Sequence, residues 1–213
     1  MQKKYISKQT IKRIPVYLHL LKEYQKSGNK VISAPVAAAE LNLNEVQVRK
    51  DFAAVSTNSG KPKAGFIVDE LITNMETLAG YNNTNDAILV GVGSLGKALL
   101  TYRGFEEYGL NIIAGFDADS KLSGTEIAGK VVHPFCQVYE FCQTNNVNIG
   151  IITVPATAAQ EVCDALVNGG IKAIWNFAPA NLAVPEGILV QNENMAASLA
   201  LLSKHLQEQI NKH

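Results

Sequence analysis

The stretch ILVGVGSLGKALL, from Ile88 to Leu100, decides the fold of this chain. It contains the pattern G-x-G-x-x-G at Gly91, Gly93 and Gly96, after a short apolar run and before a segment with helical spacing. In such a turn the first glycine permits the sharp bend, the second lets the backbone approach a pyrophosphate, and the third lets helix and strand pack closely. The stretch therefore predicts a dinucleotide site at a helix N-terminus, where phosphates are attracted.

A carboxylate follows at the distance that such a site requires. Asp117 ends the apolar run NIIAGFD, 21 residues after Gly96. At this place a carboxylate accepts hydrogen bonds from the adenine ribose and repels a 2′-phosphate, which favours NAD(H) over NADP(H). Asp119 is a less well placed candidate for the same role, and the nearby Lys121 weakens the argument for selectivity.

The rest of the C-terminal part alternates between strand-like and helix-like segments. Apolar runs of the kind buried in parallel sheets lie at residues 87–91, 111–117, 147–155 and 171–179. Amphipathic segments lie between them at residues 95–108, 135–144 and 158–168. This alternation predicts an α/β fold, a Rossmann doubly wound parallel-sheet domain over residues 81–192 that starts in a polar linker.

One more helix is expected at the C-terminus, over residues 193–213. Its apolar side chains recur at helical spacing along one side, at Met195, Leu199, Leu202, Leu206 and Ile210. The stripe is compatible with a helix that pairs with a second copy and with one that covers its own sheet.

Residues 1–80 have a different pattern, which predicts helices and a helix-turn-helix. A first helix is expected after Thr10 as its N-cap, and two short helices follow after Ser33 and Asn44 as N-caps, with another over residues 68–80. Gln47 is placed to complete a capping box with Asn44. The alternative is a generic helical hairpin with a surface loop.

The second of the short helices has the residues of a DNA-reading surface. Its apolar stripe leaves Gln47, Arg49, Lys50 and Asp51 toward solvent, and such side chains can read base edges and hold phosphates. The loop SGKPKAGF after it, residues 59–66, carries Lys61 and Lys63 and suits a wing that lies along a phosphate backbone.

Charge separates the two parts of the chain. Residues 1–63 hold twelve Lys or Arg and four Asp or Glu, a net charge of +8, whereas the remaining residues have a net charge of −8. A polyanion partner is therefore expected for the first part only.

Several functional classes are disfavoured. No apolar run is long enough to span a bilayer, the polar N-terminus is unlike a signal peptide, and the three cysteines have no metal-ligand spacing, so we expect a cytoplasmic protein with buried reduced thiols and no membrane partner. None of the four histidines has an obvious catalytic setting, and His133 is interpreted as a surface or turn residue. With no substrate domain left, the coenzyme is interpreted as a signal and not a reagent. A small NAD-dependent oxidoreductase and a CoA-binding module remain the alternatives from other classes.

In order and nearly end to end, the chain resembles the Rex family of redox-sensing transcriptional repressors. The resemblance is carried by KRIPVY at residues 12–17, VRKDF at 48–52, VDEL at 68–71, VGVGSLGKALLTYRGF at 90–105, FDAD at 116–119, TVPA at 153–156 and NFAPANLAVPE at 176–186.

The resemblance implies a homodimeric winged-helix repressor with a C-terminal helix exchanged between subunits. It implies binding to a palindromic double-stranded operator, release when NADH binds, and control of genes for fermentation and NADH reoxidation. The implied DNA contacts are Lys12, Arg13, Gln47, Arg49, Lys50, Lys61 and Lys63. The implied NAD(H) contacts are Gly91, Gly93, Ser94, Leu95, Gly96, Tyr102, Asp117, Thr153, Val154, Pro155, Asn176 and Phe177.

The chain departs from the family pattern at Asn194, where the family has an Asp before the C-terminal helix. That carboxylate helps to couple the redox state of the nicotinamide to DNA binding, and an amide is neutral. A Rex-like repressor with a weakened or lost NADH response is therefore an alternative. Residues 53–56 and the wing also differ from the family pattern.

Overall fold

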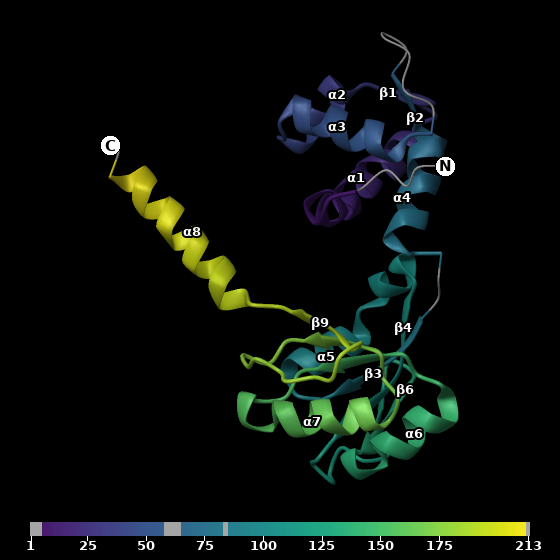
Figure 1. The fold of residues 1–213 in the computed structure, drawn as a ribbon, viewed down its shortest axis with the longest axis vertical. Coiled ribbons are helices and arrows are strands. Elements are labelled where there is room, and N and C mark those ends of the chain that lie inside the picture. Colours follow the sequence, from purple (N-terminus) through teal and green to yellow (C-terminus); the bar gives the residue numbers. More distant parts are fainter. Residues whose placement is uncertain (1–5, 58–64, 83–84, 212–213) are drawn as a thin grey trace. The chain divides into compact units, whose positions relative to one another are not determined.

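The computed structural model describes residues 6–57, 65–82 and 85–211. The chain forms two compact units, Met1–Asn83 and Thr84–His213 (Figure 1). Lys61 and Lys63 lie outside the described residues.

Unit 1 is built from helices and one small sheet. Its elements are α1 (Lys8–Lys26), β1 (Val31–Ile32), α2 (Ala34–Leu41), α3 (Glu45–Val55), β2 (Phe66–Ile67) and α4 (Val68–Ala79). Strands β1 and β2 pair antiparallel, Val31 with Ile67 and Ile32 with Phe66. The order of these elements is that of a winged helix, with α2 and α3 as the helix-turn-helix. Most of the expected wing, residues 59–66, lies outside the described residues.

The caps of unit 1 agree with the sequence at two helices and differ at one. Ser33 and Asn44 accept backbone hydrogen bonds as N-caps of α2 and α3. The expectation for α1 was wrong, because Ser7 is the N-cap and Thr10 lies inside the helix, where its N–H donates to Ser7 Oγ. The Thr10 hydroxyl is instead directed to a buried carboxylate on α3.

Unit 2 contains a seven-stranded sheet in the order β5-β6-β4-β3-β7-β8-β9. Its strands are β3 (Asn85–Val90), β4 (Leu110–Asp117), β5 (Glu126–Ile127), β6 (Lys130–Pro134), β7 (Ile149–Ile152), β8 (Ala173–Asn176) and β9 (Leu189–Asn192). All pairs are parallel except β5 with β6. Without β5, and with the other six strands renumbered 1 to 6 in chain order from β3, the spatial order is 3-2-1-4-5-6. This is the doubly wound arrangement, and its switch point lies between β3 and β7.

Helices cover both faces of this sheet. Helices α6 (Val138–Asn145) and α7 (Ala156–Asn168) lie on one face of it (Figure 1). Their residues Val138, Cys142 and Leu166 belong to the core on that face. Leu100 of α5 (Ser94–Thr101) packs on the other face with Phe105 from the 3₁₀ helix η1 (Arg103–Tyr108). The single helix expected over residues 95–108 is therefore two elements that meet at Tyr102, and a second 3₁₀ turn, η2 (Phe135–Gln137), precedes α6.

Two local expectations for unit 2 were wrong. His133 lies in β6, where its ring stacks on Phe116 at 5.4 Å, and it is not a turn residue. Cys142 and Cys163 are buried as expected, but Cys136 is exposed. Burial raises the pKa of the Cys142 thiol to about 11, so it stays protonated at neutral pH.

The last helix, α8 (Met195–Ile210), begins at Asn194, whose side chain accepts a hydrogen bond from Ala197 N. No residue of α8 is buried. Its stripe is exposed by between 55% and 65% at Met195, Leu199, Leu202, Leu206 and Ile210. The helix therefore does not cover its own sheet, and that interpretation of the stripe was wrong.

Candidate functional site

Three glycines shape the turn between β3 and α5, and each has a different reason to be glycine. Gly91 has a φ of +101°, and a Cβ there would lie 2.7 Å from Val154 Cγ1. A Cβ on Gly96 would lie 2.0 Å from the Gly91 carbonyl oxygen, so this glycine lets α5 start against β3. Gly93 has open space, because a Cβ on it would meet nothing within 4 Å. That free space is what the approach of a pyrophosphate requires.

The N-terminus of α5 is available to an anion. Gly93 is its N-cap and supplies no side-chain hydrogen bond, and Gly93 and Ser94 are exposed. Unsatisfied N–H groups and the helix dipole both favour a phosphate at such a point. Leu95 is partly buried in the same turn.

Asp117 lies beside this turn and holds it. Its Oδ2 accepts a hydrogen bond from Val92 N at 2.6 Å, and its Oδ1 accepts one from Asp119 N at 2.8 Å. Each carboxylate oxygen has further acceptor capacity, so Asp117 can still accept from ribose hydroxyls. Asp119 is exposed, and its Oδ1 accepts a hydrogen bond from Lys121 N.

A cavity of about 350 Å³ opens at the carboxyl ends of β3, β4 and β7. The residues that line it include Gly91, Gly93, Asp117, Thr153, Val154 and Pro155. The Thr153 hydroxyl donates to the Gly91 carbonyl at 2.6 Å and so ties β7 to the turn. The cavity thus lies at the topological switch point, where doubly wound folds bind their ligands.

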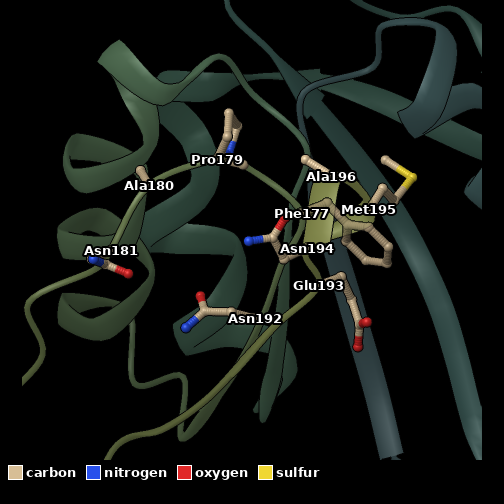
Figure 2. Close-up of a pocket in the computed structure, with 10 residues that line it drawn as sticks. Phe177, Pro179, Ala180, Asn181, Asn192, Glu193, Asn194, Met195 and Ala196 are labelled. Carbon is tan, nitrogen blue, oxygen red and sulfur yellow. The ribbon is translucent and has the colours of Figure 1, made fainter. Parts of the chain in front are cut away.

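A second cavity, of about 530 Å³, lies between the loop after β8 and the segment that joins β9 to α8. Figure 2 shows its labelled side chains on these two segments. It is lined by Phe177, Ala178, Pro179, Ala180, Asn181, Asn192, Glu193, Asn194, Met195 and Ala196. Of this set the sequence singles out Phe177, Asn194 and, as part of the C-terminal apolar stripe, Met195, because the strand β9 that brings the others here was not predicted.

Asn176 is fully buried, and its amide is bonded to residues that line this cavity. Its Nδ2 lies 2.8 Å from Asn192 Oδ1 and 3.0 Å from the Ala180 carbonyl, and its Oδ1 accepts from Ala178 N. Asn176 therefore shapes the loop after β8 and need not touch a ligand itself. Trp175 Nε1 donates to Glu193 at 3.0 Å and anchors the other segment.

Tyr102 is 53% exposed and lines neither of the two cavities described above. Its ring packs edge-on against Phe105 at 4.8 Å, and Phe105 in turn contacts Trp175 at 5.4 Å. Trp175 contacts Phe177, so a row of aromatic rings connects Tyr102 to the second cavity.

In unit 1, helix α3 presents Arg49 and Lys50 to solvent. Arg49 forms an ion pair with Glu45, one turn earlier on the same helix. Lys12 is exposed on α1.

The sequence predicts that Asp51 faces solvent, but in the structure Asp51 is buried and only 2% exposed. Four side chains donate to it: Thr10 Oγ1 at 3.0 Å, Arg13 Nε at 2.7 Å, Tyr17 Oη at 2.8 Å and Gln47 Nε2 at 3.0 Å. Gln47 therefore reaches forward to this carboxylate and does not form the expected capping box. Arg13 binds it with a second nitrogen as well, Nη2 at 3.1 Å, and is only partly exposed.

The hydrogen bonds around Asp51 decide its charge. Burial alone would raise the pKa of its carboxyl group, but the bonds from Arg13, Tyr17, Thr10 and Gln47 outweigh burial and hold the pKa below its ordinary value. The paired guanidinium has a raised pKa for the same reason. The network is thus a charged cluster that fixes α3 against α1.

Within residues 6–57, 65–82 and 85–211, no three His, Cys, Asp or Glu side chains are grouped so as to hold a metal ion. The same part of the chain has no helix that is long and apolar enough to cross a bilayer.

Family models match both units. Residues 82–180 match a model described as a CoA binding domain, and residues 5–53 match one described as a putative DNA-binding protein N-terminus. The first covers the strands and helices around the Gly91–Gly96 turn, and the second covers α1, α2 and most of α3.

Relatives match over nearly the whole chain. The redox-sensing transcriptional repressor Rex of Treponema denticola is 41% identical over 91% of this chain and 91% of its own length. The repressor of the same name from Clostridium botulinum is 36% identical over 97% of this chain and 98% of its own.

Solved structures match to the same extent. RSP in complex with β-NAD⁺ and operator DNA superposes with a TM-score of 0.88 at 33% identity, covering 98% of this chain and 96% of that one. RSP in complex with β-NADH superposes with a TM-score of 0.83 at 34% identity, covering 97% of each. The expected fold class is thereby confirmed.

Proposed function

The chain belongs to the Rex family of redox-sensing transcriptional repressors, and we propose that NAD(H) bound in unit 2 controls how unit 1 binds operator DNA. It is a DNA-binding repressor that senses NADH, and it is not an enzyme. The observation that carries this proposal is the cavity at the switch point, where an open glycine, a bare helix N-terminus and Asp117 meet.

In this proposal the coenzyme is held by the residues named from the sequence. Its pyrophosphate lies at the N-terminus of α5, against Gly91, Gly93, Ser94, Leu95 and Gly96, and its adenine ribose donates to Asp117. The nicotinamide end passes Thr153, Val154 and Pro155 toward the second cavity, with Phe177 and Tyr102 nearby. Asn176 acts through the loop that it shapes.

Operator DNA is bound by α3 and the basic groups around it. Arg49 and Lys50 face the bases, and Lys12 faces the phosphates, as do Lys61 and Lys63 on the wing. The Arg13 and Gln47 side chains hold Asp51, so their part is to orient α3. The family model described as a putative DNA-binding protein N-terminus matches residues 5–53 of unit 1, and the net negative charge of residues 64–213 disfavours a polyanion there.

The repressor acts as a homodimer that pairs through α8. An exposed stripe of five large apolar side chains is costly in water, and packing against a second subunit removes it from water. Residues 1–80 form the DNA-binding domain, residues 81–192 the NAD(H) domain and residues 193–213 the exchanged helix, in the cytoplasm. The regulated genes are those of fermentation and NADH reoxidation.

Regulation follows from two binding equilibria that share one dimer. Operator DNA and NADH each favour a different arrangement of the two subunits, so each ligand weakens the affinity for the other. Because Asn194 stands where the family has an aspartate, a second candidate is a repressor with a weaker NADH response. Its Oδ1 caps α8 as an aspartate would, but the amide brings no negative charge.

A gel-shift titration tests the proposal. Duplexes recovered from a random-sequence library by this chain are titrated at a fixed salt concentration, with NADH, with NAD⁺ and without nucleotide. NADH is expected to release the duplex. A gel shift that NADH does not change would support the repressor with the weaker NADH response. Absence of any bound duplex at low salt would refute DNA binding.

An Arg49→Ala variant tests the role of α3 in the same assay. It should weaken binding of the selected duplex by about 1–3 kcal/mol if Arg49 contacts a base. Arg103→Ala, which removes an exposed arginine of unit 2, is the matched control without nucleotide and should bind as the unchanged chain does. Equal affinity of the Arg49 variant would contradict the assignment.

A further inference from the structure

We propose that Val46 recognises the 5-methyl group of a thymine in each half-site and is a specificity-determining residue of α3. This inference rests on the proposed function, because it assumes that α3 lies in the major groove. It gives Val46 the place in base reading that the sequence suggested for Gln47.

Gln47 is already engaged within unit 1. Its amide nitrogen donates to Asp51 Oδ1 at 3.0 Å, and the side chain is partly buried. This bond holds the side chain against a carboxylate that is 2% exposed, and swinging the amide out to a base would take a donor from a buried charge, which is penalised. Gln47 is therefore a poor reader of adenine.

Val46 lies on the face of α3 that carries its cations. Residues three, four and seven positions apart share one face of a helix, so Val46, Arg49, Lys50 and Ala53 form a single strip. Val46 is 57% exposed and Arg49 and Lys50 are exposed, whereas the opposite face is buried at Val48, Phe52 and Val55. The Asp51 network locks this rotation of α3, so the strip faces outward.

The chemistry of the strip suits a base edge. It consists of two cations, a partly buried alanine and one exposed, β-branched apolar side chain. The apolar side chain lies in the first turn of the helix, the part that contacts base edges in helix-turn-helix proteins. Valine does not favour helix formation, and Val46 belongs to none of the core clusters that the described residues form. The apolar group that base edges present in the major groove is the thymine methyl. Val46 is complementary to it.

The test removes the methyl group from either side of the contact. The probe is a duplex selected by the full-length chain from a random-sequence library, with each thymine in turn replaced by deoxyuridine. Binding is measured for the unchanged chain, Val46→Ala, Val46→Thr, Gln47→Ala and Val16→Ala. Val16 lies on α1, is 48% exposed, and loses the same atoms, so it is the matched control.

The expected result is that the effect of the Val46 substitution and the effect of the thymine methyl group depend on each other at one thymine per half-site. Deoxyuridine there should weaken binding by the unchanged chain about fourfold per half-site, the effect of one buried methyl-sized group. Val46→Ala should bind the thymine probe more weakly by a similar factor and should not discriminate uracil from thymine. Val46→Thr, which keeps one methyl group, should retain part of the discrimination, and Val16→Ala all of it.

Three outcomes separate the inference from the proposed function. If the unchanged chain binds no duplex, the proposed function fails and the inference fails with it. If it binds, but no deoxyuridine weakens binding or Val46→Ala keeps the full discrimination, the inference is overturned and the proposed function stands. Loss of discrimination in Gln47→Ala alone would assign the reading to Gln47. Equal thermal unfolding of Val46→Ala and the unchanged chain shows that the variant is folded.

Discussion

Replacing Gly96 by alanine tests whether the Gly91–Gly96 turn is built as the structure describes. A Cβ at this position would lie 2.0 Å from the Gly91 carbonyl oxygen, 3.0 Å from the Gly91 carbonyl carbon and 3.1 Å from Leu89 Cδ2. The first contact is with backbone, so no side-chain rotation relieves it. The start of α5 has to move away from β3 by more than 1 Å to restore an ordinary contact of 3.4 Å.

The magnitude follows from two opposing effects. Overpacking of this kind destabilises a core by about 1–3 kcal/mol. Alanine favours the helix over glycine by up to about 1 kcal/mol, which offsets part of that loss. The net loss in the free energy of unfolding of unit 2 should be about 1–2 kcal/mol, which lowers its unfolding temperature by roughly 3–10 °C for a unit of this size.

Gly93→Ala is the matched variant, because it makes the same chemical change three residues earlier. Its Cβ would meet nothing within 4 Å, and its φ of −73° suits alanine. Alanine is the poorer N-cap, but it also restricts the unfolded chain, so stability should change by less than about 1 kcal/mol. NADH binding should nevertheless fall, because the methyl group occupies the space proposed for the pyrophosphate.

Both variants can be measured in one experiment. Trp175 is the single tryptophan of the chain and lies in β8, so its fluorescence in urea reports the unfolding of unit 2 alone. NADH affinity is measured by titration of the coenzyme's own fluorescence. An unchanged urea midpoint for Gly96→Ala, or an equal loss of stability in both variants, would falsify the account of this turn.

Three further predictions concern the other sites. Asp117→Ala should weaken NAD(H) binding by roughly 10- to 150-fold in calorimetry, which corresponds to the loss of a hydrogen bond to a charged group. Its affinity for operator DNA should stay unchanged, and Asp119→Ala should bind NAD(H) as the unchanged chain does. The pKa of Asp51 in the folded chain lies below the ordinary 3.8, so its contribution to stability is present above that value and is lost as pH falls through the folded pKa. Circular dichroism of unfolding between pH 2 and 6 should show this loss, and an Asp51→Asn variant that loses stability as steeply over the same range would rule out the carboxylate as its source. The double substitution Leu202→Lys and Leu206→Lys should shift the chain from dimer to monomer in analytical ultracentrifugation. An unaltered dimer would exclude α8 as the interface.

The nucleotide turn could be predicted from the sequence because its requirements are local. The spacing of Gly91, Gly93 and Gly96 reflects how a strand turns into a helix, and each glycine has in the structure the surroundings that its position implied. Four of the strands in unit 2 were predicted for the same reason, since a buried parallel strand is apolar along its whole length. The edge strand β9 was missed because Leu189–Asn192 has only four residues, two of them polar, and is mostly exposed, so it leaves little pattern.

The second cavity could not be predicted, because it depends on that edge strand. Asn176 and Asn192 are sixteen residues apart, and only the pairing of β8 with β9 brings their side chains into contact. Polar residues near a Rossmann strand end are commonly taken as ligand contacts, but here their hydrogen bonds are made within the chain.

The amino-acid order by itself determined the two-part organisation, the charge of each part and the dinucleotide turn, because periodicity, composition and short glycine spacings act over a few residues. The tertiary structure alone decided what Asp51 does. Its partners Thr10, Arg13 and Tyr17 lie 41, 38 and 34 residues away along the chain. No spacing rule connects such positions, and only the packing of α1 on α3 places three donors around one carboxylate and so turns Val46, Arg49 and Lys50 outward.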